Sequence, residues 1–173
     1  MNRRAAQFAT RRDSEFERVV LCHTQSLLRV ARRLTSHPWA AEDLVQDCLL
    51  LAWRSFHQFQ PGTNARAWLF RILFNDFHAK GRKVQSAPDL LPMKADFGTA
   101  SPAYDEAMDV SQALDGLPLD HRTVLLLGVV EGFTCSEMAA ILSVPIGTVM
   151  SRLSRARQAM REKLAGVGYQ ATQ

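Results

Sequence analysis

One stretch of the chain, residues 134–157, constrains the fold more than any other, because it predicts two short helices joined by a tight turn. Thr134 and Glu137 have the spacing of a capping box, in which each side chain can bond a free backbone amide of the first helical turn. Pro145 cannot continue the first helix, but its fixed φ suits the opening of the next one. The stretch therefore predicts a helix-turn-helix.

The second of these helices has an apolar side and a polar side. At about 100° per residue, one side collects the apolar residues and is expected to face the core: Val149, Leu153, Ala156, Met160 and Leu164. The other side collects Gly147, Thr148, Ser151, Ser154, Arg155 and Gln158, with Arg152 and Arg157 at its edges. Short hydroxyl side chains let a helix sit deep in a major groove, and the guanidinium group donates in pairs to guanine edges and phosphates. Together with the capping box and with Pro145, which ends one helix and opens the next, this face favours duplex DNA binding over an ordinary solvated surface.

Charge is distributed unevenly along the 173 residues, although the net charge is only +4. Residues 65–83 are mainly basic, residues 84–120 are acidic apart from Lys94, and residues 145–164 are basic again. A chain of this length can form two small cores. We therefore predict an all-α protein of two small helical domains joined by a flexible acidic linker, the second domain carrying the helix-turn-helix. The expected ranges are 14–83, 84–108 and 109–166, in that order.

Composition disfavours several classes of protein. No apolar run is long enough to span a bilayer, and the arginine-rich N-terminus lacks the apolar core of a signal peptide, so we expect a cytoplasmic protein without membrane insertion. Cys22, Cys48 and Cys135 are scattered without a C-x-x-C pair, which disfavours a disulfide framework and a zinc site. We expect each to be a small buried residue, and we expect no metal and no cofactor.

The first half of the chain predicts three helices. Ser14 can cap a helix over residues 15–33, which ends before Pro38. Residues 61–64 form a turn, and residues 65–82 form the third helix.

The second helix is expected to begin near Ala40, with Glu42 and Asp43 in its first turn, where negative charge suits the helix dipole. These carboxylates, with Gln46 and Asp47, make an acidic and amide edge suited to a basic or polar partner helix. Solvated carboxylates without a partner fit the spacing equally well.

The third helix and the residues before it combine aromatic and basic side chains. The aromatic residues are Phe56, Phe59, Trp68, Phe70, Phe74 and Phe77, and the polar or basic ones are Arg66, Arg71, Asn75, His78 and Lys80. This composition is typical of surfaces that stack or capture bases beside phosphates, although most of the aromatics are needed for the core. Asn75 and the turn at residues 61–64 are the better candidates for holding an unstacked base edge.

Both halves resemble one family, the extracytoplasmic-function (ECF) sigma factors of bacterial RNA polymerase. Its first domain is similar to AAEDLVQDCLLLAWRSFHQFQPGTNARAWLFRILFNDFHAKGRK, and its second to LDGLPLDHRTVLLLGVVEGFTCSEMAAILSVPIGTVMSRLSRAR. The resemblance covers nearly the whole chain. It implies a promoter-specificity subunit that binds core RNA polymerase and promoter DNA and needs no cofactor, while the polymerase performs the chemistry.

The resemblance also implies roles for individual residues. The beta-prime clamp helices would be bound through Glu42, Asp43, Leu44, Gln46 and Asp47, and the beta flap would be a second polymerase contact. The melted minus-ten element would be held by Gln60, Pro61, Gly62, Thr63, Asn64 and Asn75, beside Arg66, Trp68, Arg71 and His78. The minus-thirty-five duplex would be read by Thr148, Met150, Ser151, Arg152, Ser154, Arg155 and Arg157, where Met150 departs from the basic residue common in the family. The acidic linker would thread into the polymerase, and an anti-sigma factor would control the protein in a stress or envelope response.

Two other classes of protein share some of these features. A stand-alone helix-turn-helix regulator needs only the second domain and a dimerisation surface, which leaves the acidic edge at residues 42–47 without a role. A nuclease needs clustered carboxylates or a metal site beside its basic surface. Asp76 stands alone in its basic helix, so no catalytic residue is predicted.

Overall fold

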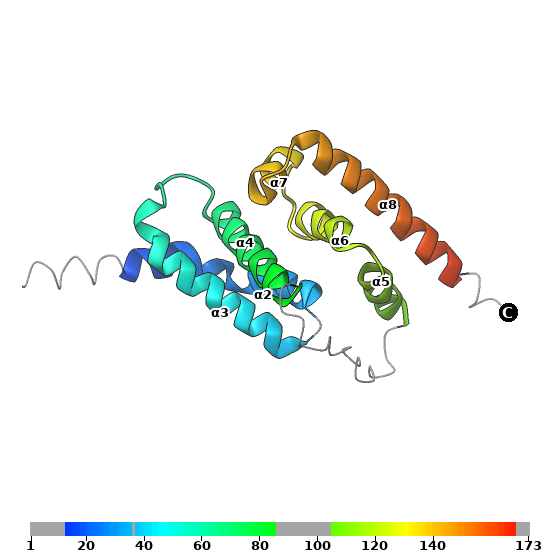
Figure 1. Ribbon diagram of the computed structural model, residues 1–173, viewed down its shortest axis with the longest axis horizontal. Coiled ribbons are helices and arrows are strands. Elements are labelled where there is room, and N and C mark those ends of the chain that lie inside the picture. Colours follow the sequence, from blue (N-terminus) through cyan, green and yellow to red (C-terminus); the bar gives the residue numbers. More distant parts are fainter. Residues whose placement is uncertain (1–12, 36, 86–104, 169–173) are drawn as a thin grey trace, which may run out of the picture. The chain divides into compact units, whose positions relative to one another are not determined.

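The computed structural model describes residues 13–35, 37–85 and 105–168, and every regular element among them is a helix (Figure 1). The chain divides into two compact units, which we call unit one (Met1–Met93) and unit two (Lys94–Gln173). The predicted all-α class with two helical domains is confirmed. Most of the expected linker lies outside the described residues.

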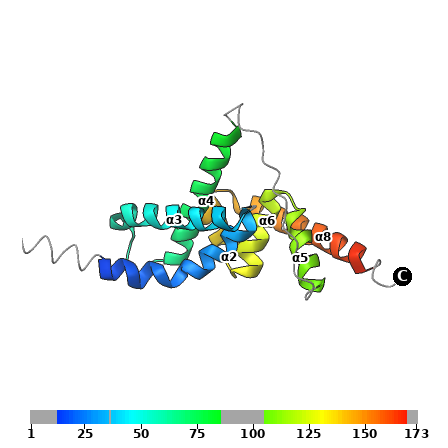
Figure 2. The same ribbon diagram turned by 90° about the horizontal axis from the view of Figure 1, so that it is seen from below.

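Unit one is a small bundle in which α2 and α4 both pack on α3, and α4 crosses the other two helices steeply (Figure 2). Residues 13–20 are also α-helical. The elements that follow are η1 (Leu21–His23), α2 (Thr24–Leu34), α3 (Pro38–Ser55), η2 (Phe56–Gln58) and α4 (Ala65–Gln85).

Two details of unit one differ from the prediction. The expected first helix is interrupted by the 3-10 turn η1 between residues 13–20 and α2. Helix α3 begins at Pro38, because a proline ring is pre-set for the first turn of a helix. Glu42 and Asp43 therefore lie beyond the first turn, and the predicted dipole interaction is wrong.

The core of unit one is apolar and aromatic. Its most deeply buried side chains come from residues 13–20 and from all three long helices: Val20, Leu27, Val30, Ala31, Ala41, Leu44, Cys48, Ala52, Leu69, Phe70, Leu73 and Phe74. The prediction that most aromatics fill the core holds for Phe56, Phe70 and Phe74.

The cysteines do not share one environment. Cys48 is buried as predicted, its thiol donates to the Leu69 carbonyl, and burial raises its pKa to about 12. Cys22 is exposed on η1, so the prediction of a buried residue is wrong there. That prediction rested on the general tendency of cysteine to be buried, which says nothing about which side of the 3-10 turn η1 a residue occupies.

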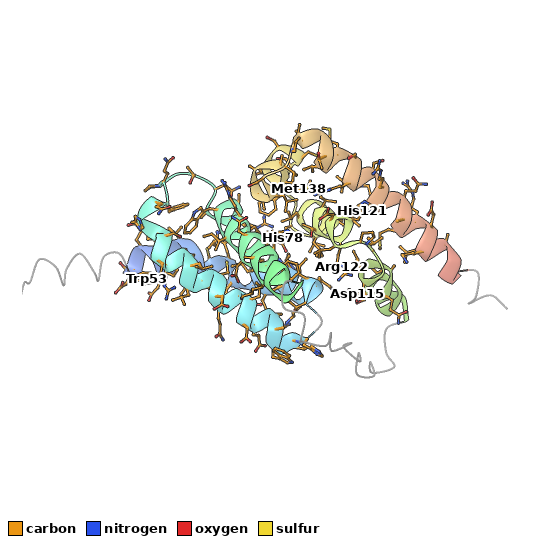
Figure 3. All side chains as sticks on the ribbon, viewed as in Figure 1. Trp53, His78, Asp115, His121, Arg122 and Met138 are labelled. Carbon is orange, nitrogen blue, oxygen red and sulfur yellow. The ribbon has the colours of Figure 1, made fainter. Side chains whose placement is uncertain are left out.

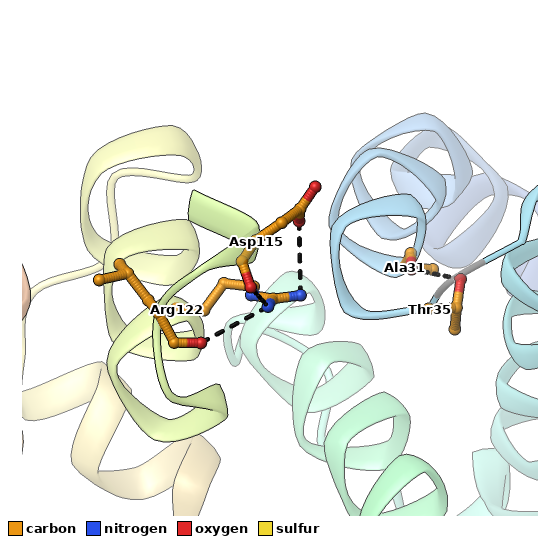
Figure 4. Close-up of polar contacts among 5 residues, drawn as sticks. Ala31, Thr35, Asp115 and Arg122 are labelled. Carbon is orange, nitrogen blue, oxygen red and sulfur yellow. Dashed lines mark hydrogen bonds and ion pairs between the residues drawn. The ribbon is translucent and has the colours of Figure 1, made fainter. Parts of the chain in front are cut away.

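Unit two contains α5 (Asp105–Asp115), α6 (Leu119–Leu125), the π-helical turn η3 (Leu126–Val130), α7 (Cys135–Leu142) and α8 (Ile146–Gly168). Helix α8 packs against α5, α6 and α7. The corner between α5 and α6 is tied by Arg122, whose guanidinium donates to the carbonyl of Asp115 and lies 3.5 Å from its carboxylate (Figure 4).

The two helices beside the predicted linker extend into its range, since α4 continues to Gln85 and α5 begins at Asp105. The exact domain boundaries remain predictions.

Replacing Phe70 by alanine is expected to destabilise unit one by about 3–5 kcal/mol, because the ring is fully buried and its removal leaves a cavity. Urea unfolding followed by tryptophan fluorescence measures this, since Trp39, Trp53 and Trp68 all lie in unit one. Leu50, which is 46% exposed, is the control. Leu50→Ala should change the stability by about 0.5 kcal/mol or less, and equal effects of the two variants would contradict the core assignment.

Candidate nucleic-acid and polymerase interfaces

The first helix of the predicted helix-turn-helix is α7, and its cap is confirmed. The hydroxyl of Thr134 accepts from the Glu137 amide at 3.2 Å, and the Glu137 carboxylate accepts from the Thr134 amide at 2.9 Å. Met138 and Ile141 are buried and hold α7 in the core. In Figure 3, Met138 lies on α7.

The turn between the two helices is closed by backbone bonds. Ser143 adopts the left-handed conformation with φ 55°, and the Val144 amide donates to the Ala139 carbonyl at 3.1 Å. The carbonyl of Pro145 accepts from the amides of Thr148 and Val149, so the proline stands immediately before α8 and caps it. The sequence predicts this role of Pro145 at the opening of the second helix.

Helix α8 separates its residues largely as expected, although Met160, Leu164 and Thr148 are half-buried. Val149, Leu153 and Ala156 are buried, with at most 7% exposure. We call the opposite, exposed side the outer face; it consists of Ser151, Ser154, Arg155 and Gln158. Met150 is 54% exposed at the edge of this face.

The two flanks of the outer face differ. On the α6 side, a nitrogen of Arg152 lies 2.5 Å from a carboxylate oxygen of Asp120, and the Arg152 side chain is only 27% exposed. On the α7 side there is an open hollow of about 400 Å³, which is lined by Met150, Ser154, Arg157, Arg161, Leu153 and Cys135. Arg161 was not among the predicted site residues, although its spacing from Arg157 places both on one side of α8.

In unit one, the turn before α4 is ordered by its own side chains and is exposed. Thr63 donates its hydroxyl to the Gln60 carbonyl at 2.7 Å, and the Asn64 side chain accepts from the Ala67 amide at 3.0 Å, which caps α4. Gly62 has φ 86°, a conformation that favours glycine. The whole predicted loop, Gln60 to Asn64, is therefore presented on the surface.

One face of α4 continues from this loop. Arg71 and Asn75 are exposed, and His78 is half-buried one turn further along the helix (Figure 3). Trp68 shares this face by spacing, but it is half-buried, and its ring packs 5.2 Å from that of Phe59.

Arg66 is not brought to this face. Its guanidinium lies over the ring of Phe70 at 5.9 Å. Burial, and then the positive charge of Arg66, lower the pKa of His23 below its ordinary value, which places Arg66 near η1. Arg66 and Arg71 are five residues apart, so the helical spacing also places them on different sides of α4.

The acidic edge of α3 is split between surface and interior. Glu42, Asp43 and Gln46 are exposed, as a binding edge requires. Leu44 is 2% exposed and belongs to the core, so its predicted role as a surface contact is corrected. The apolar pattern of α3 already points Leu44 inward.

Asp47 is engaged within unit one. Its carboxylate lies 2.6 Å from Lys80 of α4, and Lys80 also lies 2.7 Å from Asp76. Burial lowers the pKa of Lys80, but the bonds to Asp47 and Asp76 outweigh it, so the pKa is raised overall. Sequence reasoning missed this triad, because residues 33 positions apart meet only through helix packing.

In the part of the chain that the structure describes, no group of three or more His, Cys, Asp or Glu side chains could hold a metal ion. None of the helices in that part is long and apolar enough to cross a membrane.

Both units match known families. The family "Sigma-70 region 2" matches residues 19–84, and "Sigma-70, region 4" matches residues 107–160. The chain is 37% identical over 142 residues to the ECF RNA polymerase sigma factor EcfG of Rhodopseudomonas palustris, covering 80% of this chain and 78% of that protein. The chain belongs to the ECF sigma factors.

Other relatives agree with this assignment. SigE of Mycolicibacterium smegmatis, an ECF sigma factor, is 34% identical over 159 residues, covering 87% of this chain and 62% of SigE. Among solved structures, RpoE of Bartonella quintana, in complex with the anti-sigma factor NepR, superposes with a TM-score of 0.74 at 35% identity. That match covers 87% of this chain and 97% of RpoE. CnrH, in complex with the cytosolic domain of CnrY, gives a TM-score of 0.68 at 26% identity and covers 94% of this chain and 95% of CnrH.

The family defines the function at the level of the whole protein. This ECF sigma factor is a promoter-specificity subunit, in which unit one carries region 2 and unit two carries region 4. The alternative of a stand-alone helix-turn-helix regulator is set aside, because a regulator of that kind has no region 2.

Replacing Thr134 by alanine removes the two bonds of its hydroxyl, one accepted from the Glu137 amide and one donated to the Glu137 carboxylate, and is expected to destabilise α7 by about 1 kcal/mol. Hydrogen exchange of the α7 amides measures this change within unit two. Thr148→Ala is the control, because Thr148 lies inside α8 and caps no helix. Unchanged protection of α7 in Thr134→Ala would show that the cap contributes nothing.

Proposed function

We propose that the outer face of α8 reads the minus-thirty-five element as duplex DNA. The observation that carries this proposal is the exposure of Ser151, Ser154 and Arg155 on the side of α8 opposite its buried residues, Val149, Leu153 and Ala156. Small hydroxyl side chains allow close approach to the groove floor, and Arg155 can donate in pairs to a guanine edge. Thr148, Met150 and Arg157 border this face and would contact the DNA at its rim.

Unit one would hold the melted minus-ten element. The exposed turn from Gln60 to Asn64 stands at the start of α4, and Arg71 and Asn75 continue the same surface. An amide side chain and a guanidinium suit an unstacked base and its phosphate, and Trp68 and His78 offer ring edges beside them. Arg66 has no part in this surface, since it lies over Phe70.

Core polymerase would be bound through two separate surfaces. The exposed acidic edge of α3, Glu42, Asp43 and Gln46, suits a basic helix pair such as the clamp helices of the beta-prime subunit. In unit two, an apolar groove of about 360 Å³ suits an apolar segment such as the beta flap; it is lined by Val110, Leu114, Leu125, Val129, Val130, Met160, Arg157 and Arg161.

The protein would act in the cytoplasm, without chemistry of its own, under an anti-sigma factor in a stress response. Support comes from RpoE of Bartonella quintana, which is 35% identical and was solved bound to the anti-sigma factor NepR. Val129, Val130 and Trp39 are between 46% and 62% exposed and would suit such a partner, because large exposed apolar groups mark interaction surfaces.

Replacing Arg155 by alanine is expected to weaken holoenzyme binding to its promoter about tenfold through lost minus-thirty-five contacts. The promoter is first obtained by run-off transcription of source-genome DNA with core polymerase and this protein. Filter binding then compares promoter DNA with the same DNA carrying a scrambled minus-thirty-five element. Arg18→Ala removes an exposed arginine of unit one as the control. If Arg155→Ala binds both DNAs as the unchanged protein does, the outer face is not the reading surface.

Replacing Asp43 by arginine is expected to weaken assembly with core polymerase about tenfold, because a cation would then face a basic partner. Fluorescence anisotropy of labelled protein titrated with core polymerase measures the affinity. Glu17→Arg makes the same charge change at an exposed position outside α3. Equal affinities of the two variants would remove the α3 edge from the polymerase interface.

A further inference from the structure

We propose that Asp120 is a positioning residue for minus-thirty-five recognition. By binding Arg152, it fixes the rotation of α8 about its own axis, and Arg152 is a brace within unit two instead of a DNA contact. This inference rests on the proposed function, in which the outer face of α8 reads the duplex.

The pair joins the helix that reads DNA to the helix that supports it. Asp120 lies in the first turn of α6, where the helix dipole favours a carboxylate. Arg152 lies on α8, one residue after Ser151 and three before Arg155. With 2.5 Å between the two charged groups and the Arg152 side chain 27% exposed, the guanidinium is turned toward α6 and away from the outer face.

Apolar packing against α5, α6 and α7 holds α8 on the core and sets its approximate rotation. The buried stripe contains Val149 and Ala156, whose side chains are short, with Leu153 between them. On the α7 side, the flank of α8 borders the open hollow of about 400 Å³ beneath Arg157 and Arg161. Beside this packing, the ionic contact with Asp120 on the α6 side adds a directional restraint on the rotation of α8.

Helix α6 is itself held on its other side. Arg122, two residues after Asp120, bonds the carbonyl of Asp115 at the end of α5 and pairs with its carboxylate (Figure 4). A continuous series of polar contacts therefore runs from α5 through α6 to α8. A small rotation of α8 would move Ser151 and Arg155 out of register with the base edges, because binding geometry tolerates only small angular errors.

A phosphate contact by Arg152 makes opposite predictions. If Arg152 left Asp120 for a DNA phosphate, the carboxylate would only compete with DNA, and removing its charge would strengthen binding to every sequence. A lost phosphate contact would also reduce the salt dependence of binding. The brace changes sequence preference and leaves the salt dependence as it is.

The test uses holoenzyme assembled from core polymerase and full-length protein, with the promoter and its scrambled minus-thirty-five counterpart as probes. Asp120→Asn and Arg152→Gln should each lower the preference for the intact element about fivefold. The double variant should lose no more than either single variant, because both remove the same contact. The slope of log affinity against log salt should stay unchanged in all three.

Controls separate the brace from general damage. Glu17→Gln removes an exposed carboxylate of unit one, outside this series of contacts, and it should keep the preference. The charge-exchanged variant, Asp120→Arg with Arg152→Asp, should recover most of it. Tighter binding of Asp120→Asn to both DNAs, or a salt slope lower by about one in Arg152→Gln, would overturn the brace and make Arg152 a phosphate contact.

Arg155→Ala, measured in the same assay, separates a failure of the positioning role of Asp120 from a failure of the reading role of the outer face. If Arg155→Ala lowers the preference and Asp120→Asn does not, the brace is wrong and the reading face stands. If Arg155→Ala leaves the preference unchanged, the reading face is wrong, and the positioning role that depends on it falls with it.

Discussion

Each unit depends on one long helix that buries one side in its own core and leaves the other side to partners. In unit one, α4 buries Phe70 and Phe74 and exposes Arg71 and Asn75. In unit two, α8 buries its apolar stripe and exposes the outer face, including Arg155. The same helical period therefore serves stability and recognition, because burial of one face fixes where the other must point.

Charged residues near these helices have two different uses. Asp43 and Arg155 are exposed and are available to partners. Lys80 and Arg152 instead bind carboxylates of a neighbouring helix, at 2.6 and 2.5 Å. Exposed ion pairs contribute little to stability, about 0–1 kcal/mol, so their main consequence is geometric. In the proposed interfaces, they would set how the acidic edge of α3 and the outer face of α8 are presented to their partners.

Much of the fold could be predicted because its signals are local. The capping box at Thr134 and Glu137 uses bonds between residues three apart, and the buried stripe of α8 follows from helical spacing alone. The errors arose where local geometry changes or where two signals compete. Cys22 lies exposed on the 3-10 turn η1, although cysteine is usually buried, and Pro38 starts α3 earlier than its apolar pattern suggests.

The sequence by itself determined the helical class, the helix-turn-helix, the outer face of α8 and the exposed turn before α4, because spacing within one helix decides which side chains share a face. Only the tertiary structure decided which charged residues remain available. Leu44 is taken into the core, Arg66 turns to Phe70, and Arg152 is held by Asp120. These outcomes depend on how separate helices pack against one another, and side chains distant in sequence meet only through that packing.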